Sequence, residues 1–178
     1  MGGVRLRLPG RPAGGAGDGE GRELVIQVVT DGDLTGCFAV RREVFVVEQR
    51  IPEEEEMDAY DAHAVHLLAT DAEGAPVGTV RFLHGAAADK KYAHAGVDGA
   101  TTAVLGRLAV TRAARGTGLG AELVRAVEAE ARRRGLDEVY LEAQTHALGF
   151  YERLGYEAYG AEFDEGSGIP HRAMRRPL

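Results

Sequence analysis

The chain has little cysteine, no long apolar run and no excess of positive charge. Because Cys37 is the only cysteine, no internal disulfide can form, and we expect a cytoplasmic location. We expect this thiol to pack inside a helix rather than act as a nucleophile. No apolar stretch approaches the ~20 residues that span a bilayer, and no signal-peptide core stands near the first residue. The sequence therefore predicts no membrane partner.

The balance of charge excludes a second class of partner. The formal net charge is −7, from 28 acidic and 21 basic residues. Wholesale binding to the phosphate backbone of nucleic acid is therefore not expected. The 178 residues, of which 44% are hydrophobic, suffice for one domain with a sizeable core.

Residues 1–21 differ in composition from the rest of the chain. They contain eight glycines and two prolines and show no apolar periodicity. Such a segment cannot bury enough apolar surface to offset the entropy of ordering it. We therefore expect a disordered leader there, outside a single domain at residues 22–178.

The remaining pattern predicts a mixed α/β (α+β) fold. Helical spacing of apolar residues indicates helices from about Asp33 to Val47, at 117–134 and at 147–154. The order of these elements predicts one twisted, largely antiparallel sheet of about six to seven strands flanked by about four helices. Apolar, β-branched runs place the strands near residues 23–30, 65–70, 77–83, 104–110, 138–144, 156–163 and 171–175.

Two stretches give weaker signals. Pro52 heads a segment with six acidic residues between positions 53 and 61. We expect a solvated loop there, because proline does not continue a helix, and the alternative is an electronegative rim that attracts a cationic amine. Residues 85–100 are small, polar and mixed in charge, and we expect them to form a mobile insertion.

The most informative stretch is 104–124, which predicts a strand, a glycine-bearing loop and a helix. Three glycines and an arginine fall within Arg115-Gly-Thr-Gly-Leu-Gly120. Glycine permits positive φ and close approach of a ligand. The start of a helix presents unpaired N–H groups and the positive end of the helix dipole. The loop therefore predicts an anion site, for which phosphate is the usual ligand.

Three phosphate ligands compete for this loop. A nucleoside-triphosphate loop needs a lysine after the glycines, and none follows here. A dinucleotide fingerprint is formally matched by Gly116, Gly118 and Ala121, with Glu142 as the later acid, which would suit a nicotinamide oxidoreductase. About a hundred residues precede these glycines, however, whereas such domains begin with their fingerprint. The third ligand is coenzyme A.

Coenzyme A is favoured by a resemblance to a known family. Arg115-x-x-Gly118-x-Gly120, between a strand and a helix, resembles the acyl-CoA pyrophosphate loop of the GNAT family of N-acetyltransferases. Phe150-Tyr-Glu-Arg-Leu-Gly-Tyr156 looks like the last helix of that family. Residues 42–49 and 168–174 resemble its small bacterial ElaA-type branch. The motifs follow the family's order and cover about residues 23–176.

The resemblance implies both a fold and a chemistry. The sheet should splay between its fourth and fifth strands, where acetyl-CoA wedges as the co-substrate. Tyr151 is the implied catalytic residue, and no metal is required. The implied reaction moves an acetyl group to a primary amine by direct attack in a ternary complex. The alternative is a non-catalytic acyl-CoA sensor or interaction module on the same fold. The implied coenzyme contacts are Leu108, Ala109, Val110, Arg115, Gly116, Thr117, Gly118, Leu119, Gly120, Gln144 and Phe150.

The sequence leaves the acceptor and the general base open. The acceptor is a small-molecule or peptide amine, and a homodimer is compatible with the fold. Arg107 stands on the central strand where some relatives place a glutamate, which weakens transfer of their base to this chain. A water chain would serve as well as a side chain, and the side-chain candidates are Glu142, Gln144, His66, Glu48 and His146.

Overall fold

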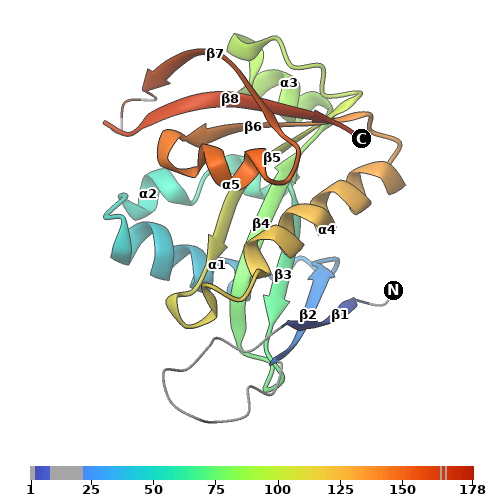
Figure 1. The fold of residues 1–178 in the computed structure, drawn as a ribbon, viewed down its shortest axis with the longest axis vertical. Coiled ribbons are helices and arrows are strands. Elements are labelled where there is room, and N and C mark those ends of the chain that lie inside the picture. The colour runs from blue at the N-terminus through green and yellow to red at the C-terminus, as the bar shows by residue number, and fades with distance from the viewer. Residues whose placement is uncertain (1–2, 9–21, 165, 167) are drawn as a thin grey trace. The chain divides into compact units, whose positions relative to one another are not determined.

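The computed structural model describes residues 3–8, 22–164, 166 and 168–178 (Figure 1). Its elements follow one another along the chain as β1 (Val4–Leu8), β2 (Arg22–Val28), α1 (Thr35–Arg41), η1 (Arg42–Glu48), α2 (Glu53–Glu56), η2 (Ala59–His63), β3 (Val65–Thr70), β4 (Pro76–Leu83), α3 (Gly85–Lys91), η3 (Ala93–Ala95), β5 (Thr102–Val110), η4 (Arg112–Ala114), α4 (Leu119–Arg133), β6 (Glu138–Gln144), η5 (Thr145–Ala147), α5 (Leu148–Glu152), β7 (Glu157–Asp164) and β8 (Pro170–Pro177).

Eight strands of the described chain form one sheet, in the order β1-β2-β3-β4-β5-β6-β8-β7. Four strand pairs, β1–β2, β2–β3, β6–β8 and β7–β8, are antiparallel, whereas β5 and β6 run parallel. The parallel ladder joins residues 102–104 to residues 138–140, although both strands continue farther. The predicted fold class is confirmed, with one strand more than expected.

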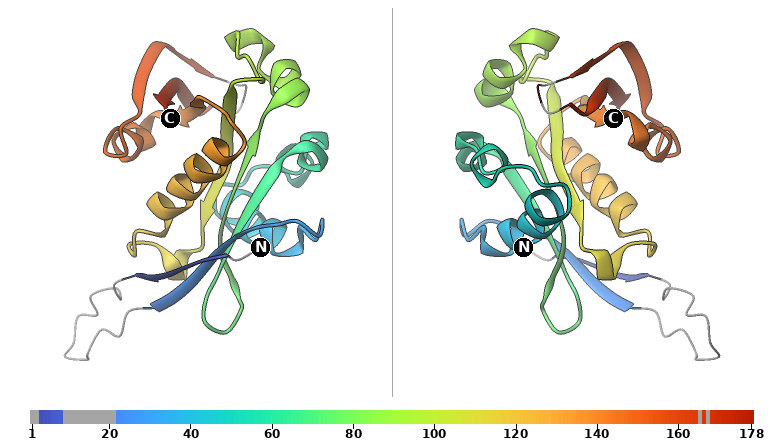
Figure 2. Two further views of the ribbon diagram at one scale, coloured as in Figure 1. Left: turned by 90° about the vertical axis from the view of Figure 1, so that its right-hand side faces the viewer. Right: turned by 90° about the vertical axis from the view of Figure 1, so that its left-hand side faces the viewer.

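The additional strand, β1, falls inside the glycine-rich segment 1–21. Val4 pairs with Ile26 and Arg7 with Glu23 in an antiparallel ladder, and β1 lies alongside β2 in both views of Figure 2. Apolar and arginine residues alternate over positions 4–8, which suits a strand with one exposed face. The surrounding glycines obscured this short signal. The expectation that all of residues 1–21 lie outside the fold is therefore wrong for residues 4–8, while 1–2 and 9–21 lie outside the described residues.

The described chain divides into two compact units, and each has a core of its own. One unit contains the residues up to Arg81 together with Arg107–Val127, and the other contains Phe82–Gly106 with Glu128–Leu178. Fully buried side chains in the first include Val40, Val80, Leu119 and Leu123. Those in the second include Phe82, Val104, Leu141 and Met174.

The long helix α4 forms as its apolar spacing predicts. Leu119, Leu123, Val127 and Ala131 recur every fourth residue, and each is at most 1% exposed. The helix ends at Arg133, and Gly135 follows with φ 76°. Leu136 N donates to Ala131 O at 3.0 Å, and Gly135 N donates to Arg132 O at 2.9 Å, which is the Schellman pattern. Neither α4 nor any other described helix is long and apolar enough to cross a membrane.

The first predicted helix changes type along its length. Asp33 Oδ1 accepts a hydrogen bond from the N–H of Thr35, the first residue of α1, at 3.0 Å, although Leu34 occupies the N-cap position. From Arg42 the chain continues as the π-helix η1. Near its end Gln49 N donates to Val44 O, five residues earlier. Apolar spacing alone did not reveal this wider turn.

The acidic segment is only in part the solvated loop that the sequence suggested, because residues 53–55 are exposed but two later carboxylates are buried. Pro52 precedes the short helix α2 instead of preventing one, because proline is tolerated where a backbone N–H would have no helical partner. Glu56 and Asp61 are 2% and 7% exposed. Burial of carboxylates requires paired cations, and these are described below.

The segment 85–100 is also more regular than expected, because it forms α3 and η3. Gly85 N donates to Gly99 O at 2.6 Å, and Asp89 Oδ1 accepts from Gly99 N at 2.7 Å. Ala88 is completely buried. The segment that was expected to be a mobile insertion is therefore closed by hydrogen bonds between its ends and is packed.

This closure predicts a sharp effect of one added methyl group. A Cβ on Gly99 would lie 2.9 Å from Gly85 N and closer still to Gly85 O, and both are backbone atoms that cannot move aside freely. We expect Gly99→Ala to lower the free energy of unfolding by about 1–3 kcal/mol, the usual range for overpacking. Gly149→Ala in α5 is the control, because its Cβ meets only a flexible Arg153 atom at 3.5 Å. Urea denaturation measures both; equal stabilities would contradict the packed closure.

Candidate active site

The predicted anion loop connects β5 to α4. After β5 ends at Val110, the 3-10 turn η4 occupies Arg112–Ala114. Gly116 and Gly118 then adopt φ values of 77° and 88°, a region that glycine enters without steric cost. α4 begins at Leu119, and Glu122 N donates to Gly118 O as its first turn closes. The two glycines thus reverse the chain directly into the helix.

The space over this turn is open. A Cβ placed on Gly116 or Gly118 would meet no atom within 4 Å apart from its chain neighbours. The first four N–H groups of a helix have no intrahelical acceptor, and they carry the positive end of the dipole. α4 is 15 residues long, so this end has its full dipole. The turn therefore fits a diphosphate, which needs close backbone approach and several N–H donors.

Two threonines behave differently around the loop. Thr117 is 5% exposed, and its hydroxyl donates to Ala114 O at 2.7 Å, so this side chain braces the loop from inside. Thr111 is 6% exposed, and its hydroxyl has no hydrogen-bond partner in the described part of the chain. Buried hydroxyls usually have a partner. Within the described residues, Thr111 is therefore the buried hydroxyl of the loop region that has no partner.

Carboxylates of η1 contact the segment that leads into the loop. Arg115 Nε donates to Val110 O at 3.0 Å, and Arg115 Nη1 lies 2.8 Å from Glu48 Oε2. Glu43 Oε1 accepts from Arg112 N at 3.2 Å. Arg115 and Glu48 are both substantially exposed, so water screens this ion pair and its net contribution is small. The Arg115 side chain can therefore exchange partners at low cost.

The strand before the loop contains an unusual backbone conformation. Ala109 is buried, whereas Leu108 and Val110 are partly exposed. Arg107, directly before them, has φ 54°. The left-handed region costs an L-residue about 1–2 kcal/mol, and such residues persist only where their surroundings hold them.

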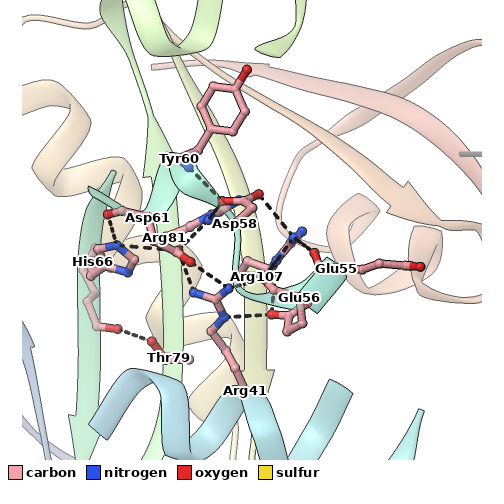
Figure 3. Close-up of polar contacts among 11 residues, drawn as sticks. Arg41, Glu55, Glu56, Asp58, Tyr60, Asp61, His66, Thr79, Arg81 and Arg107 are labelled. Atoms are coloured by element: carbon pink, nitrogen blue, oxygen red, sulfur yellow. Dashed lines mark hydrogen bonds and ion pairs between the residues drawn. The ribbon is translucent and has the colours of Figure 1, made fainter. Parts of the chain in front are cut away.

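Arg107 belongs to a buried charge cluster formed by Arg41, Arg81, Arg107, Glu56, Asp58 and Asp61 (Figure 3). Arg41 is 1% exposed and donates from Nε to Glu56 Oε1 and from Nη1 to Asp61 Oδ1, both at 2.7 Å. Arg81 holds both oxygens of Asp58, at 2.7 and 2.8 Å. Three positive and three negative side chains therefore neutralise one another.

The environment shifts the pKa values of the cluster in different directions. Burial raises the pKa of Glu56, and the charges of Arg107, Arg41 and Arg81 offset only part of this. Burial would also raise the pKa of Asp61, but its hydrogen bonds and ion pairs with Arg41 and Arg81 outweigh it, so this pKa is lowered. Burial lowers the pKa of His66, whose Nε2 donates to Asp61 O at 2.9 Å. His66 is thus a neutral member of the scaffold.

Sequence reasoning missed this cluster, although one signal was present. Arg41 follows Val40 on the apolar face of a helix, and Arg81 follows Val80 within an apolar strand. A charged residue in such a place requires a partner of opposite sign. The nearby carboxylates at positions 56, 58 and 61 supply it. Removing one member of a buried ion pair typically costs about 3–5 kcal/mol, so the cluster fixes how α1, α2, β4 and β5 join in the first unit.

The remaining predicted site residues belong to the second unit. Tyr151 in α5 is 8% exposed and packs edge-on against Phe150 and Tyr156, with ring centroids 4.9 and 5.8 Å away. Burial raises the pKa of the Tyr151 phenol. Gln144 ends β6 and lies opposite His171 in the β6–β8 ladder. The structure thus packs Tyr151 against Phe150 and places Gln144 at the end of β6.

Besides His66, two more of the candidate bases have partners. Glu142 Oε1 accepts from Tyr140 Oη at 2.7 Å and lies 2.8 Å from His94 Nε2. Glu48 pairs with Arg115, as described above. Among the residues that the structure describes, no group of three histidine, cysteine or acidic side chains is arranged to hold a metal ion.

Comparison with known proteins agrees with this geometry. The model of the acetyltransferase (GNAT) family matches residues 33–156. The uncharacterized protein YyaT of Bacillus subtilis is 34% identical over 155 residues, which cover 85% of this chain and 94% of YyaT. The crystal structure of an acyl-CoA N-acyltransferase from Pseudomonas aeruginosa is 34% identical, with a TM-score of 0.68 over 87% of this chain and 99% of that one.

The structure of Escherichia coli ElaA is also similar, with 27% identity and a TM-score of 0.69 over 87% of this chain and 99% of ElaA. This similarity confirms the resemblance to the ElaA-type branch. The family match alone covers more than half of the sequence. The chain belongs to the GNAT family of acetyltransferases.

Proposed function

We propose that this protein transfers the acetyl group of acetyl-CoA to a primary amine by direct attack in a ternary complex. The open glycine turn at the start of α4 carries this proposal, because it supplies N–H donors and space for a diphosphate directly after β5. Membership of the acetyltransferase family supports the choice of coenzyme. Acetyl-CoA supplies the reactive thioester, and the protein supplies binding, orientation and charge stabilisation.

The coenzyme would be held by the loop and by β5. The N–H groups of residues 116–120 bind the diphosphate, and Arg115 adds a charge-assisted contact when it leaves Glu48. The backbone of residues 108–110 pairs with the pantetheine arm in the manner of an added strand. One N–H of this strand polarises the thioester oxygen. A single donor of this kind is typically worth about 3–4 kcal/mol of transition-state stabilisation.

Tyr151 would assist the departing sulfur. Its burial raises a phenol pKa that normally lies near 10, well above the ~8.5 of a thiol. Full proton transfer to the thiolate is therefore uphill, and Tyr151 acts mainly by donating a hydrogen bond to the developing negative charge. The thiolate takes up its proton as the product leaves. The phenol can serve in this way without ionising.

The incoming amine must lose a proton before or during attack. A lysine-like amine with an unperturbed pKa near 10.4 is only about 0.04% neutral at pH 7. The acidic segment offers less attraction for a cationic amine than its sequence suggested, because Glu56 and Asp61 are neutralised by arginines. Glu54 and Glu55 remain exposed and continue to favour a positively charged acceptor.

Binding and catalysis can be tested separately. We expect calorimetry to show saturable acetyl-CoA binding, and an amine panel analysed by mass spectrometry to yield an acetylated product with release of free coenzyme A thiol. Binding without thiol release from any amine would favour the non-catalytic sensor. Absence of both heat and thermal stabilisation at millimolar acetyl-CoA would reject coenzyme binding.

The glycine turn predicts a specific loss of affinity. We expect Gly118→Ala to weaken coenzyme A binding by at least about tenfold, or ~1.4 kcal/mol, because alanine disfavours φ 88° and the N–H groups move. Gly74→Ala is the matched control: φ is 82° in the β3–β4 turn, and its Cβ also meets nothing within 4 Å. Both variants should lose similar stability. Equal coenzyme affinity in both, measured by calorimetry, would show that the turn does not bind the diphosphate.

The Tyr151 hydroxyl predicts an effect on rate rather than on binding. We expect Tyr151→Phe to lower turnover by about tenfold or more while acetyl-CoA affinity changes little, because only the hydrogen bond to the thiolate is lost. Tyr156→Phe is the control, since its hydroxyl donates to Glu128 at 3.1 Å and should affect stability instead. The measurement is thiol release with an amine identified by the panel. An unchanged rate for Tyr151→Phe would remove this residue from the mechanism.

A further inference from the structure

Arg107 combines a strained backbone with an anchored side chain. Among the described residues, Arg50 and Arg107 are the two non-glycine residues with positive φ. Arg107 lies inside β5, where left-handed residues bend a strand and re-aim the residues beside them. Gly106 stands next to it but does not adopt positive φ. The left-handed position is thus occupied by an arginine although a glycine would adopt it more easily.

The Arg107 side chain reaches the end of α2. Its Nε and Nη2 each lie 3.3 Å from Glu56 O, and Nη2 also lies 3.4 Å from Glu55 O. Nε is 3.1 Å from Glu56 Oε1, and Nη2 is 3.5 Å from Asp58 Oδ2 (Figure 3). The guanidinium therefore holds two carbonyls at a helix C-terminus together with two carboxylates. Such an array matches the planar fork of arginine and not a point charge.

The groups that hold Arg107 are themselves fixed. Glu56 is 2% exposed and accepts from Arg41 Nε, while Arg41 Nη2 donates to Glu56 O. Asp58 is held by both terminal nitrogens of Arg81. Because Glu56 is buried, Asp58 is partly buried and both are paired with other arginines, they cannot readily follow Arg107 if it moves. They form a fixed set of contacts for Arg107, the one residue of β5 with positive φ.

We propose that Arg107 is a positioning residue that sets the backbone of residues 108–110 for polarising the thioester, through its contacts with Glu56 and Asp58. This inference rests on the proposed function, in which these three residues hold the pantetheine arm and the thioester oxygen. The arginine does not contact the reacting atoms. It fixes the direction of the strand that carries the N–H donor, and such donors act only when preorganised.

The readout must report on the thioester itself. A hydrogen bond to the carbonyl oxygen weakens the C=O bond and lowers its stretching frequency. Isotope-edited infrared spectroscopy of bound acetyl-CoA, labelled at the thioester carbonyl, measures this shift directly. No acceptor is needed. Calorimetry with coenzyme A measures the diphosphate contacts independently.

The decisive variant is Arg107→Gly, which keeps positive φ accessible and removes the side-chain anchor. We expect the carbonyl shift of the wild-type protein to fall by more than half, while coenzyme A affinity stays within about threefold. Arg107→Lys keeps the charge but not the fork, and we expect an intermediate shift. Arg50→Gly is the matched control, because Arg50 has φ 59° and is exposed. It should retain the full shift.

Each outcome has one meaning. A wild-type carbonyl shift retained in Arg107→Gly would overturn the positioning role and leave the proposed function standing. Failure of the wild-type protein to bind acetyl-CoA would instead reject the proposed function. If thermal denaturation shows that Arg107→Gly does not fold, Arg107→Lys decides: a full shift there overturns the proposal, and a reduced shift with retained coenzyme A affinity supports it.

Discussion

The proposed binding of a diphosphate depends on the backbone of a single turn. Gly116 and Gly118 take positive φ at the entry to α4, and the space where their side chains would lie is open. An anion bound there gains several donors and the helix dipole without the burial of any charged side chain. The turn can be held open because the hydroxyl of Thr117 braces it from within and the apolar face of α4 is fully buried. The proposal that the protein binds coenzyme A rests on this geometry.

The buried charge cluster has a different role in the same unit. It joins α1, α2, β4 and β5 through arginines and carboxylates that cancel in charge. Buried ion pairs are weak evidence for stability, because the attraction must first offset the desolvation of both partners. Here the ion pairs fix the relative positions of these elements, because each planar guanidinium can pair with its carboxylates in only a few orientations. The strained Arg107 is tied to this fixed array, which links a helix far back in the sequence to the strand expected to hold the thioester.

The fold was largely predictable from local patterns, and the site only in part. The helix α4 and its end before Gly135 could be predicted from the sequence. The four-residue apolar spacing marks a buried helix face, and a glycine after a helix favours its termination. The glycine loop before α4 could also be predicted, because its glycines are close together in the sequence. The burial of Glu56 and Asp61 was not, since it depends on arginines at positions 41 and 81 that only tertiary structure brings near. β1 and the packed segment around Gly85 and Gly99 were also missed, because their pairing partners are distant or lie within glycine-rich sequence.

The most direct test of the central claim observes the amides of the turn. Nuclear magnetic resonance of the nitrogen-15-labelled protein, titrated with coenzyme A, reports on each backbone N–H. The account predicts that the amides of residues 116–120 shift together, saturate with coenzyme concentration and move in the direction expected for new hydrogen bonds to phosphate. Saturable shifts confined to other parts of the chain, with these amides unmoved, would contradict it.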